Sequence, residues 1–326
     1  MPDALRLMVP MSALRLMVEP HLGGTYAQLL RLARAAEDAG WDALFRSDHL
    51  FHPAQPTPPA LEAWTTLAGL ARDTARIRLG TLVTPMTFRH PSVLAREVAT
   101  VDEMSGGRVE LGVGTGWFEV EHSTLGIPFP SMRERTDRLH EAVEVITRLW
   151  TGQPVSYQGT HYRLDGAVAR PRPVQDPLPL IVGGHGGRRS TQLAARHATE
   201  YNTTSTDPAG AAQTFAAVRA ACEAEGRDPA TLRTTWMGTV LTGRDEAALR
   251  RRLDRYAEWT GGPDGAGDLR SRIEPTNVVG VYEEAAEKLR AYLDAGAQRV
   301  YARIWDLDDL DQISEISEEL LPRAIR

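Results

Sequence analysis

Short apolar runs alternate along this chain with longer stretches in which apolar residues recur at helical spacing. In the first long stretch, Leu29, Ala33 and Ala36 follow one another three or four positions apart, which predicts an amphipathic helix. Gly40 stands where such a helix usually ends. The short runs are rich in Val, Ile and Leu and predict strands. The predicted strands are 13–18, 43–46, 77–83, 109–113, 180–182, 200–202, 234–241 and 299–304, and the predicted helices are 26–39, 62–73, 91–104, 134–150, 188–198, 209–225, 246–259, 282–295 and 310–321.

Eight strands that alternate with helices predict an α/β fold, a (β/α)8 TIM barrel. A doubly wound sheet ranks second because such sheets usually have about five to seven strands. Residues 151–179 interrupt the alternation and predict an irregular insertion before strand five, with a hairpin at 155–164. The Gly-rich segment 261–267 predicts a flexible excursion.

The first residues contain a duplication. Residues 4–9 read ALRLMV and recur as residues 13–18. A barrel needs one first strand, and the second copy joins directly to the following loop and helix. We therefore expect residues 1–12 to be an N-terminal extension and residues 13–326 to form a single barrel domain, with Met11 as a candidate start.

Composition narrows the class of protein. Of 326 residues, 42% are hydrophobic and 25% are charged, as in ordinary globular proteins. The net charge of -6 argues against nucleic acid or an anionic membrane as the partner. No apolar run approaches the roughly 20 residues that span a bilayer, and residues 1–10 lack a signal-peptide pattern. These features predict a cytoplasmic protein that acts on a small molecule.

A metal site is not expected. The single cysteine, Cys222, excludes an intrachain disulfide and a cysteine-cluster metal site. The first strand ends in Glu19-Pro20-His21, which is not the H-x-H pattern of barrel metallohydrolases, and the H-E-x-x-H pattern is absent.

The pair Asp48-His49 follows predicted strand two, at the end of a parallel strand where ligands usually bind. A histidine there can exchange a proton near neutral pH, and a neighbouring carboxylate can fix its tautomer. The alternative is a loop histidine beside an N-capping aspartate. Because three further strand ends carry ligand-type residues, we favour the chemical interpretation for His49.

The end of strand five is the clearest signal for a phosphate. Its glycines let backbone N–H groups approach an anion, and the next helix directs its positive end toward the same place. No Lys-Ser/Thr follows, so the segment is not a P-loop, and a Gly-rich turn that binds nothing is the alternative. The candidate phosphate-binding residues are Gly183, Gly184, His185, Gly186, Gly187 and Arg188.

Strand four ends in the sequence GVGTGW at residues 112–117. The spacing G-x-G-x-G and the position on the fourth strand argue against a Rossmann dinucleotide site and favour a flat ring lying against the backbone. Trp117 can line that pocket or serve as a core or rim residue. Glu119, Glu121 and His122 can act as acid or base, although a solvated helix start explains them equally well. For Arg89 and His90, capping and structural pairing are favoured over catalysis.

Taken together, these segments resemble the bacterial luciferase-like monooxygenase superfamily, and specifically its coenzyme F420-dependent oxidoreductases. The resemblance runs from about residue 14 to residue 322. Its most specific parts are FRSDH at 45–49, EAWTTL at 62–67, RIRLGTLVTP at 76–85, SGGRVELG at 105–112 and GIPFP at 126–130.

The resemblance implies a TIM barrel that holds the deazaflavin F420 at its carboxyl rim, with the phosphate on residues 183–188. In characterised relatives, the histidine that matches His49 moves the proton that accompanies hydride transfer, and Asp48 would contact the cofactor or orient that histidine. The Leu82–Val83 peptide bond would be cis, and a homodimer is expected. The residues that would contact the ring are Leu82, Val83, Thr84, Thr115 and Gly116.

Two positions depart from the sugar-phosphate dehydrogenase of this family. Trp117 replaces a glutamate and Pro53 replaces a tryptophan, so glucose 6-phosphate is not the expected substrate. Trp117 and Phe51 would instead form an apolar substrate pocket. The leading hypothesis is hydride transfer between F420 and a small apolar organic substrate; the alternatives are an FMN-dependent monooxygenase that uses reduced flavin and oxygen, and a non-catalytic flavin-binding protein.

Overall fold

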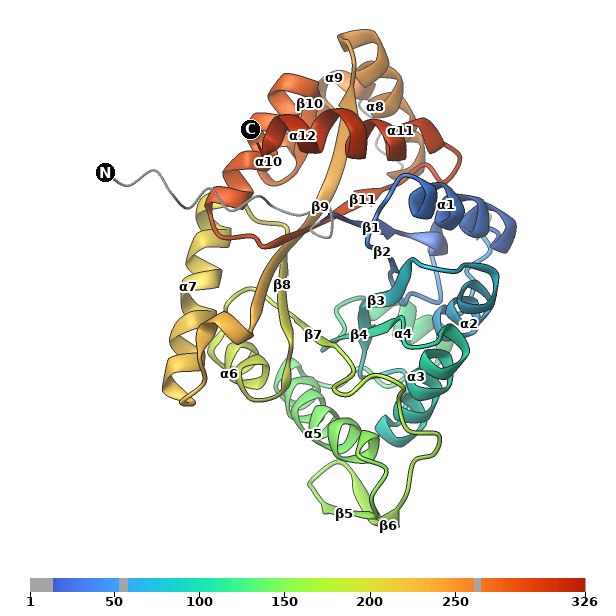
Figure 1. The fold of residues 1–326 in the computed structure, drawn as a ribbon, viewed down its shortest axis with the longest axis vertical. Helices are drawn as coiled ribbons and strands as arrows, with labels where there is room; N and C mark the ends of the chain where they lie inside the picture. The colour runs from blue at the N-terminus through green and yellow to red at the C-terminus, as the bar shows by residue number, and fades with distance from the viewer. Residues whose placement is uncertain (1–13, 53–57, 261–264, 326) are drawn as a thin grey trace.

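Eight parallel strands close into a barrel in the computed structural model, which describes residues 14–52, 58–260 and 265–325 (Figure 1). The barrel order is β1-β2-β3-β4-β7-β8-β9-β11, and the β8–β9 and β11–β1 pairings close it. The predicted barrel is confirmed, whereas the extension 1–12 and Pro53 lie outside the described residues. The barrel strands are β1 (Leu14–Val18), β2 (Ala43–Arg46), β3 (Arg78–Pro85), β4 (Val109–Gly114), β7 (Leu180–Gly183), β8 (Glu200–Thr204), β9 (Arg233–Gly243) and β11 (Arg299–Ile304).

Helices cover the outside of the barrel (Figure 1). Most begin and end within two residues of the predicted bounds. The last helix differs, because it consists of α11 (Leu310–Glu315), a π-helical turn at Ile316–Leu320 and α12 (Leu321–Ala324), and the helix α4 was not predicted. The other helices that follow barrel strands or the added strand β10 are α1 (Tyr26–Asp38), α2 (Ala63–Asp73), α3 (Pro91–Ser105), α4 (Glu119–Leu125), α5 (Met132–Trp150), α6 (Arg188–His197), α7 (Pro208–Ala224), α8 (Glu246–Thr260) and α10 (Tyr282–Asp294).

The predictions for the two irregular segments, 151–179 and 261–267, compare differently with the structure. The insertion contains the predicted hairpin, in which β5 (Val155–Gln158) pairs antiparallel with β6 (Arg163–Ala167). The prediction of an excursion at 261–267 is wrong from Gly265 onward, because a helix, α9 (Gly265–Ile273), begins there. An unpredicted strand, β10 (Val278–Val281), pairs with β9 beyond the part of β9 that pairs with β11. The length of β9 leaves its far end free to accept this added strand.

Successive side chains along a barrel strand point alternately toward the surrounding helices and into the barrel, so the apolar side chains form two separate clusters. On β1, Leu14, Leu16 and Val18 pack against the helices, whereas Met17 belongs to a small cluster inside the barrel. This is the period of two that a strand imposes on its side chains. Arg15 shares the inward side with Met17 and is fully buried.

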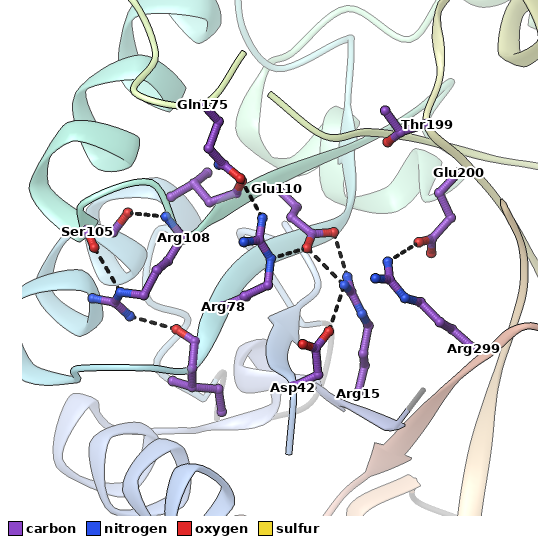
Figure 2. Close-up of polar contacts among 12 residues, drawn as sticks. Arg15, Asp42, Arg78, Ser105, Arg108, Glu110, Gln175, Thr199, Glu200 and Arg299 are labelled. Carbon is purple, nitrogen blue, oxygen red and sulfur yellow. Dashed lines mark hydrogen bonds and ion pairs between the residues drawn. The ribbon is translucent and has the colours of Figure 1, made fainter. Parts of the chain in front are cut away.

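Charged side chains fill the amino end of the barrel (Figure 2). Arg15 donates to both carboxylate oxygens of Glu110, at 2.5 and 2.9 Å, and to Asp42 at 2.9 Å. Burial alone would raise the pKa of Glu110, but Arg15, Arg78 and Arg299 lower it to about 2. A pocket of about 600 Å³ lies among the polar groups at this end, lined in part by Arg78, Glu110 and Arg299. A second cavity, lined by the ends of all eight strands, lies at the carboxyl end, where ligands of TIM barrels bind.

Candidate active site

A cavity of about 430 Å³ opens at the carboxyl ends of the barrel strands. All eight strands or the loops after them contribute to its wall, as expected for the ligand-binding end of a TIM barrel. One lining residue from each strand end, in chain order, is Glu19, His49, Val83, Gly114, Gly183, Asn202, Met237 and Arg303.

His49 lines this cavity and is bound to a carboxylate from another strand end. Its Nδ1 lies 2.9 Å from Oε2 of Glu121, which is almost fully buried. The other oxygen of Glu121 accepts from the backbone N–H groups of Leu50 and Phe51. Glu121 therefore fixes both the ring of His49 and the loop that carries it. It also leaves Nε2 as the ring nitrogen without a partner among the described residues.

The charges around His49 favour its protonated form. Burial lowers the pKa of His49, but the hydrogen bond to Glu121 and the nearby Glu19 and Asp48 carboxylates outweigh burial and raise that pKa above its usual value. Burial raises the pKa of Glu121, yet His49 and the two backbone N–H groups lower it below its usual range. An ionised Glu121 beside His49 is the arrangement that lets an imidazole hold and release a proton near neutral pH.

The sequence interpretation gave Glu121 little weight, because a solvated helix start explained it equally well. It lies in the first turn of α4, where the negative charges of Glu119 and Glu121 interact favourably with the positive end of the helix dipole. Glu119 is exposed, and both ring nitrogens of His122 are occupied, by Thr87 and by the backbone oxygen of Phe118. Of the three candidates in this segment, Glu121 alone contacts His49.

Asp48 occupies a different environment from the expected one. Its carboxylate accepts from the hydroxyl of Thr84 at 2.9 Å and from Arg89 at 2.6 and 3.2 Å, and it is almost completely buried. Arg89 also contacts Glu62 and Glu97. The expectation that Asp48 orients His49 is therefore corrected: the orienting carboxylate is Glu121. The structural role favoured for Arg89 is confirmed, as is the cap role of His90, which accepts from Ser92.

Two further candidates point elsewhere. Thr84 is fully buried and donates to Asp48, so its hydroxyl belongs to the wall behind the cavity. Phe51 is not among the described residues that line the cavity, and its backbone N–H is the part that binds Glu121. The hydroxyl of Thr84 and the backbone of Phe51 thus each bind a buried carboxylate beside the cavity.

Replacing Asp48 by alanine is expected to lower the free energy of unfolding by about 3 kcal/mol, because it leaves Arg89 buried without its main partner. Urea denaturation followed by circular dichroism measures the change. Asp38→Asn is the matched control, since its ion pair with Arg76 is exposed. A stable Asp48→Ala variant that has lost cofactor affinity would instead make Asp48 a cofactor ligand.

Glycines surround the side chain of Val83 on the opposite wall. The Leu82–Val83 bond is cis, as the resemblance implied. A Cβ on Gly114 would come within 2.7 Å of Val83, and one on Gly183 within 3.1 Å. A Cβ on Gly112 would lie 2.2 Å from the backbone oxygen of Thr81. These glycines let β4 and β7 pack closely against β3 at Val83, and Val83, Gly114 and Gly183 line the cavity together with Thr115 and Gly116.

The glycine segment after β7 leads into α6 as predicted. Gly183, Gly184 and His185 line the cavity, and Gly187 is the N-cap of α6 without a side-chain hydrogen bond. The N–H of Gly186 donates to the hydroxyl of Tyr201 at 2.9 Å, so this N–H is not free for an anion. Arg188 is exposed and has no partner among the described residues, whereas Arg189 is paired with Asp137.

Trp117 stands at the mouth of the cavity. Its side chain is largely exposed, yet its ring contacts that of His49 edge to face, with centroids 5.7 Å apart, and stacks on Phe118 at 5.1 Å. It is thus a rim residue that also lines the pocket. The ring of His21 lies 4.7 Å from that of His49, centroid to centroid, and contacts Glu19, which in turn contacts Arg303. This polar group was not predicted from the sequence, because its members follow strands at the two ends of the chain.

The model of the luciferase-like monooxygenase family matches residues 11–316. The chain belongs to the luciferase-like monooxygenase family. Within the described residues of this family member, no helix is long and apolar enough to cross a membrane, and no cluster of three or more His, Cys, Asp or Glu side chains could hold a metal ion.

Curated relatives in the family include an F420-dependent glucose-6-phosphate dehydrogenase of Nakamurella multipartita. It is 32% identical over 318 residues, which cover 91% of this chain and 92% of the relative. An F420-dependent hydroxymycolic acid dehydrogenase of Mycobacterium tuberculosis is 35% identical over 68% of this chain and 61% of its own length.

Solved structures with the same fold include an F420-dependent secondary alcohol dehydrogenase with an F420–acetone adduct. It has a TM-score of 0.80 and 22% identity, covering 96% of this chain and 99% of that one. The F420-dependent tetrahydromethanopterin reductase of Methanopyrus kandleri has a TM-score of 0.78 and 21% identity, covering 95% and 99%. These likenesses support the fold of the family.

Proposed function

We propose that this chain is an F420-dependent oxidoreductase that transfers a hydride between the deazaflavin and a small organic substrate, with His49 moving the accompanying proton. The observation that carries the proposal is that the His49–Glu121 pair and the glycine-lined wall at Val83 face one cavity. Two curated relatives that depend on F420 support the same cofactor.

The residues fit a flat ring with an anionic tail. Gly114 and Gly183 bring backbone to the cavity wall beside Val83, which suits a flat ring, and the exposed Arg188 at the start of α6 suits a phosphate. When bound, F420 supplies the two-electron hydride chemistry. Leu82, Val83, Thr115 and Gly116 would hold the ring, and residues 183–188 would hold the phosphate.

This chain's own contribution to the reaction is proton transfer and positioning. Reduction of a C=C, C=N or carbonyl group consumes one hydride and one proton, and Nε2 of His49 is the free nitrogen that can deliver that proton. Glu121 holds the ring in place and stabilises its charged form. Trp117 and Phe118 cover the mouth and would exclude water, which suits a substrate with an apolar part.

Titration of the purified protein with oxidised F420 and with FMN, followed by fluorescence, tests the proposal. F420 is expected to bind and FMN to bind much more weakly. Tight FMN binding without any response to F420 would overturn the proposal and favour a flavin-dependent monooxygenase of the same family.

Replacing Arg188 by glutamine is expected to weaken F420 affinity by about tenfold and to reduce its dependence on salt, because one charge-assisted contact to the phosphate is lost. The same fluorescence titration at low and high salt measures both effects. Arg189→Gln is the matched control, since Arg189 is already paired with Asp137. Equal affinities for the two variants would place the phosphate elsewhere.

A further inference from the structure

The cavity has a polar side that lies across the barrel from the glycine-lined wall. In the closed order of strands, β1 and β11 stand opposite β7 and β4. Glu19 follows β1 and Arg303 lies near the end of β11, and both line the cavity. Because β1 pairs with β2, which leads into His49, a substrate that reacts beside His49 would lie next to this polar side.

Glu19 carries a buried oxygen without a partner. Its side chain is 10% exposed, and its Oε2 has no hydrogen-bond partner among the described residues. Nδ1 of His21 lies 3.6 Å away, beyond a hydrogen bond, and 3.4 Å from the hydroxyl of Ser47. A buried carboxylate oxygen without a donor is unfavourable, so a site with this geometry favours a ligand that supplies one.

His21 does not supply the missing charge. Burial and the neighbouring His49 and His52 rings lower the pKa of His21 to about 4, although Glu19 and Glu121 oppose that change. The imidazole is thus neutral near neutral pH, and its contact with Glu19 is not an ion pair.

Arg303 has donors to spare beside Glu19. Its Nε and one terminal nitrogen both donate to the single hydroxyl oxygen of Thr239, which also accepts from the indole of Trp305. The other terminal nitrogen lies 3.5 Å from Oε1 of Glu19. A guanidinium carries five N–H groups, so Arg303 retains capacity to donate to a ligand oxygen.

We propose that Glu19 and Arg303 form a substrate subsite that recognises a neutral hydroxyl group on a carbon other than the reacting one. The hydroxyl would donate to the carboxylate of Glu19 and accept from Arg303. This proposal rests on the proposed function, because it takes the reacting carbon to lie beside His49. It assigns the substrate to hydroxylated carbonyl compounds and their alcohols, instead of purely apolar molecules.

The charges on this side decide between a hydroxyl and an anion. A carboxylate or phosphate would be attracted by Arg303 but repelled by Glu19, which lies beside it and already neutralises it. An apolar group would leave Oε2 of Glu19 buried without a donor. A site built to bind a hydroxyl rejects the analogue that lacks it, because its own polar groups are then left unpaired.

Binding of three matched ketones to the enzyme loaded with oxidised F420 tests the subsite without turnover of the ketone. The probes are cyclohexanone, 4-hydroxy-4-methylcyclohexanone, whose tertiary alcohol has no hydride to give to F420, and 4-oxocyclohexanecarboxylate, and their binding is measured by calorimetry. The hydroxy ketone is expected to bind about tenfold or more tightly than the other two. Equal binding of the three probes, or no detectable binding of the hydroxy ketone, would overturn the subsite.

Two substitutions of Glu19 separate its role from general packing. Glu19→Ala is expected to bring the hydroxy ketone and cyclohexanone to within about twofold of each other. Glu19→Gln keeps a carbonyl acceptor but removes the charge, so binding of the carboxylate probe should rise about tenfold as Arg303 loses its neutralising partner. Because Glu19→Gln is nearly isosteric, it tests the role of Glu19 in the subsite even if Glu19→Ala folds poorly.

The exposed Glu103 on α3 provides the control, and Glu103→Gln should leave all three affinities unchanged. A hydroxyl preference that survives Glu19→Ala, or a carboxylate affinity that Glu19→Gln leaves unchanged, contradicts the proposal. Failure of the proposed function gives a different result: F420 itself would not bind. If F420 binds normally while the ketones are not distinguished, the subsite alone is wrong.

Discussion

His49→Ala is expected to lower kcat by about 100-fold or more while F420 affinity changes little. The imidazole lines the cavity and has its Nδ1 held by Glu121, so its Nε2 is the proton donor that the substitution removes. Steady-state oxidation of reduced F420 by a ketone, together with an F420 titration, measures both quantities.

His161→Ala is the matched control, because His161 lies on the turn between β5 and β6 and is not among the described residues that line the cavity. Unchanged kcat in His49→Ala would leave the proton to another group. If the variant lost F420 affinity instead, His49 would be a cofactor contact and not the proton donor.

Glu121→Gln is expected to lower kcat/KM near neutral pH by about tenfold or more and to move its pH profile to lower pH. Burial lowers the pKa of His49, and the charge of Glu121 raises it. Removal of that charge therefore lowers the pKa of His49. In the reducing direction His49 must be protonated, and activity falls as pH rises through its pKa. In the variant that fall begins at lower pH, so the loss is smaller at about pH 6 than at neutral pH.

The exposed Glu119, in the same first turn of α4, supplies the control. Glu119→Gln should keep the wild-type pH profile, because it leaves the contact of Glu121 with His49 intact. A Glu121→Gln variant with reduced activity but an unshifted profile would limit Glu121 to holding the loop at Leu50 and Phe51.

Local sequence was enough to place the barrel strands, the histidine and the glycine-lined strand ends. Each depends on a short-range property: the period of two or 3.6, the turn chemistry of glycine, or the position of a residue just after an apolar run. For His49 and the segment 183–188, position at a strand end already implied position at the rim, because parallel strands of a barrel all end on the same side.

The partner of His49 could not be obtained in this way. Asp48 is its neighbour in the chain, but consecutive residues of an extended segment point to opposite sides, so adjacency works against contact. Glu121 lies 72 residues away and reaches His49 only because α4 begins beside the end of β2.

The charged interior and the polar subsite also could not be predicted from local sequence, because their members are far apart in the chain. Arg15 and Glu110 lie 95 residues apart and read as ordinary polar positions of strands, until barrel closure turns both inward and pairs them. Glu19 and Arg303 come from the first and last strands, which only the closed barrel makes neighbours. Short-range periodicity determines which residues form each strand and helix, whereas closure of the sheet determines which charges face one another, and those pairings set the chemistry of the cavity.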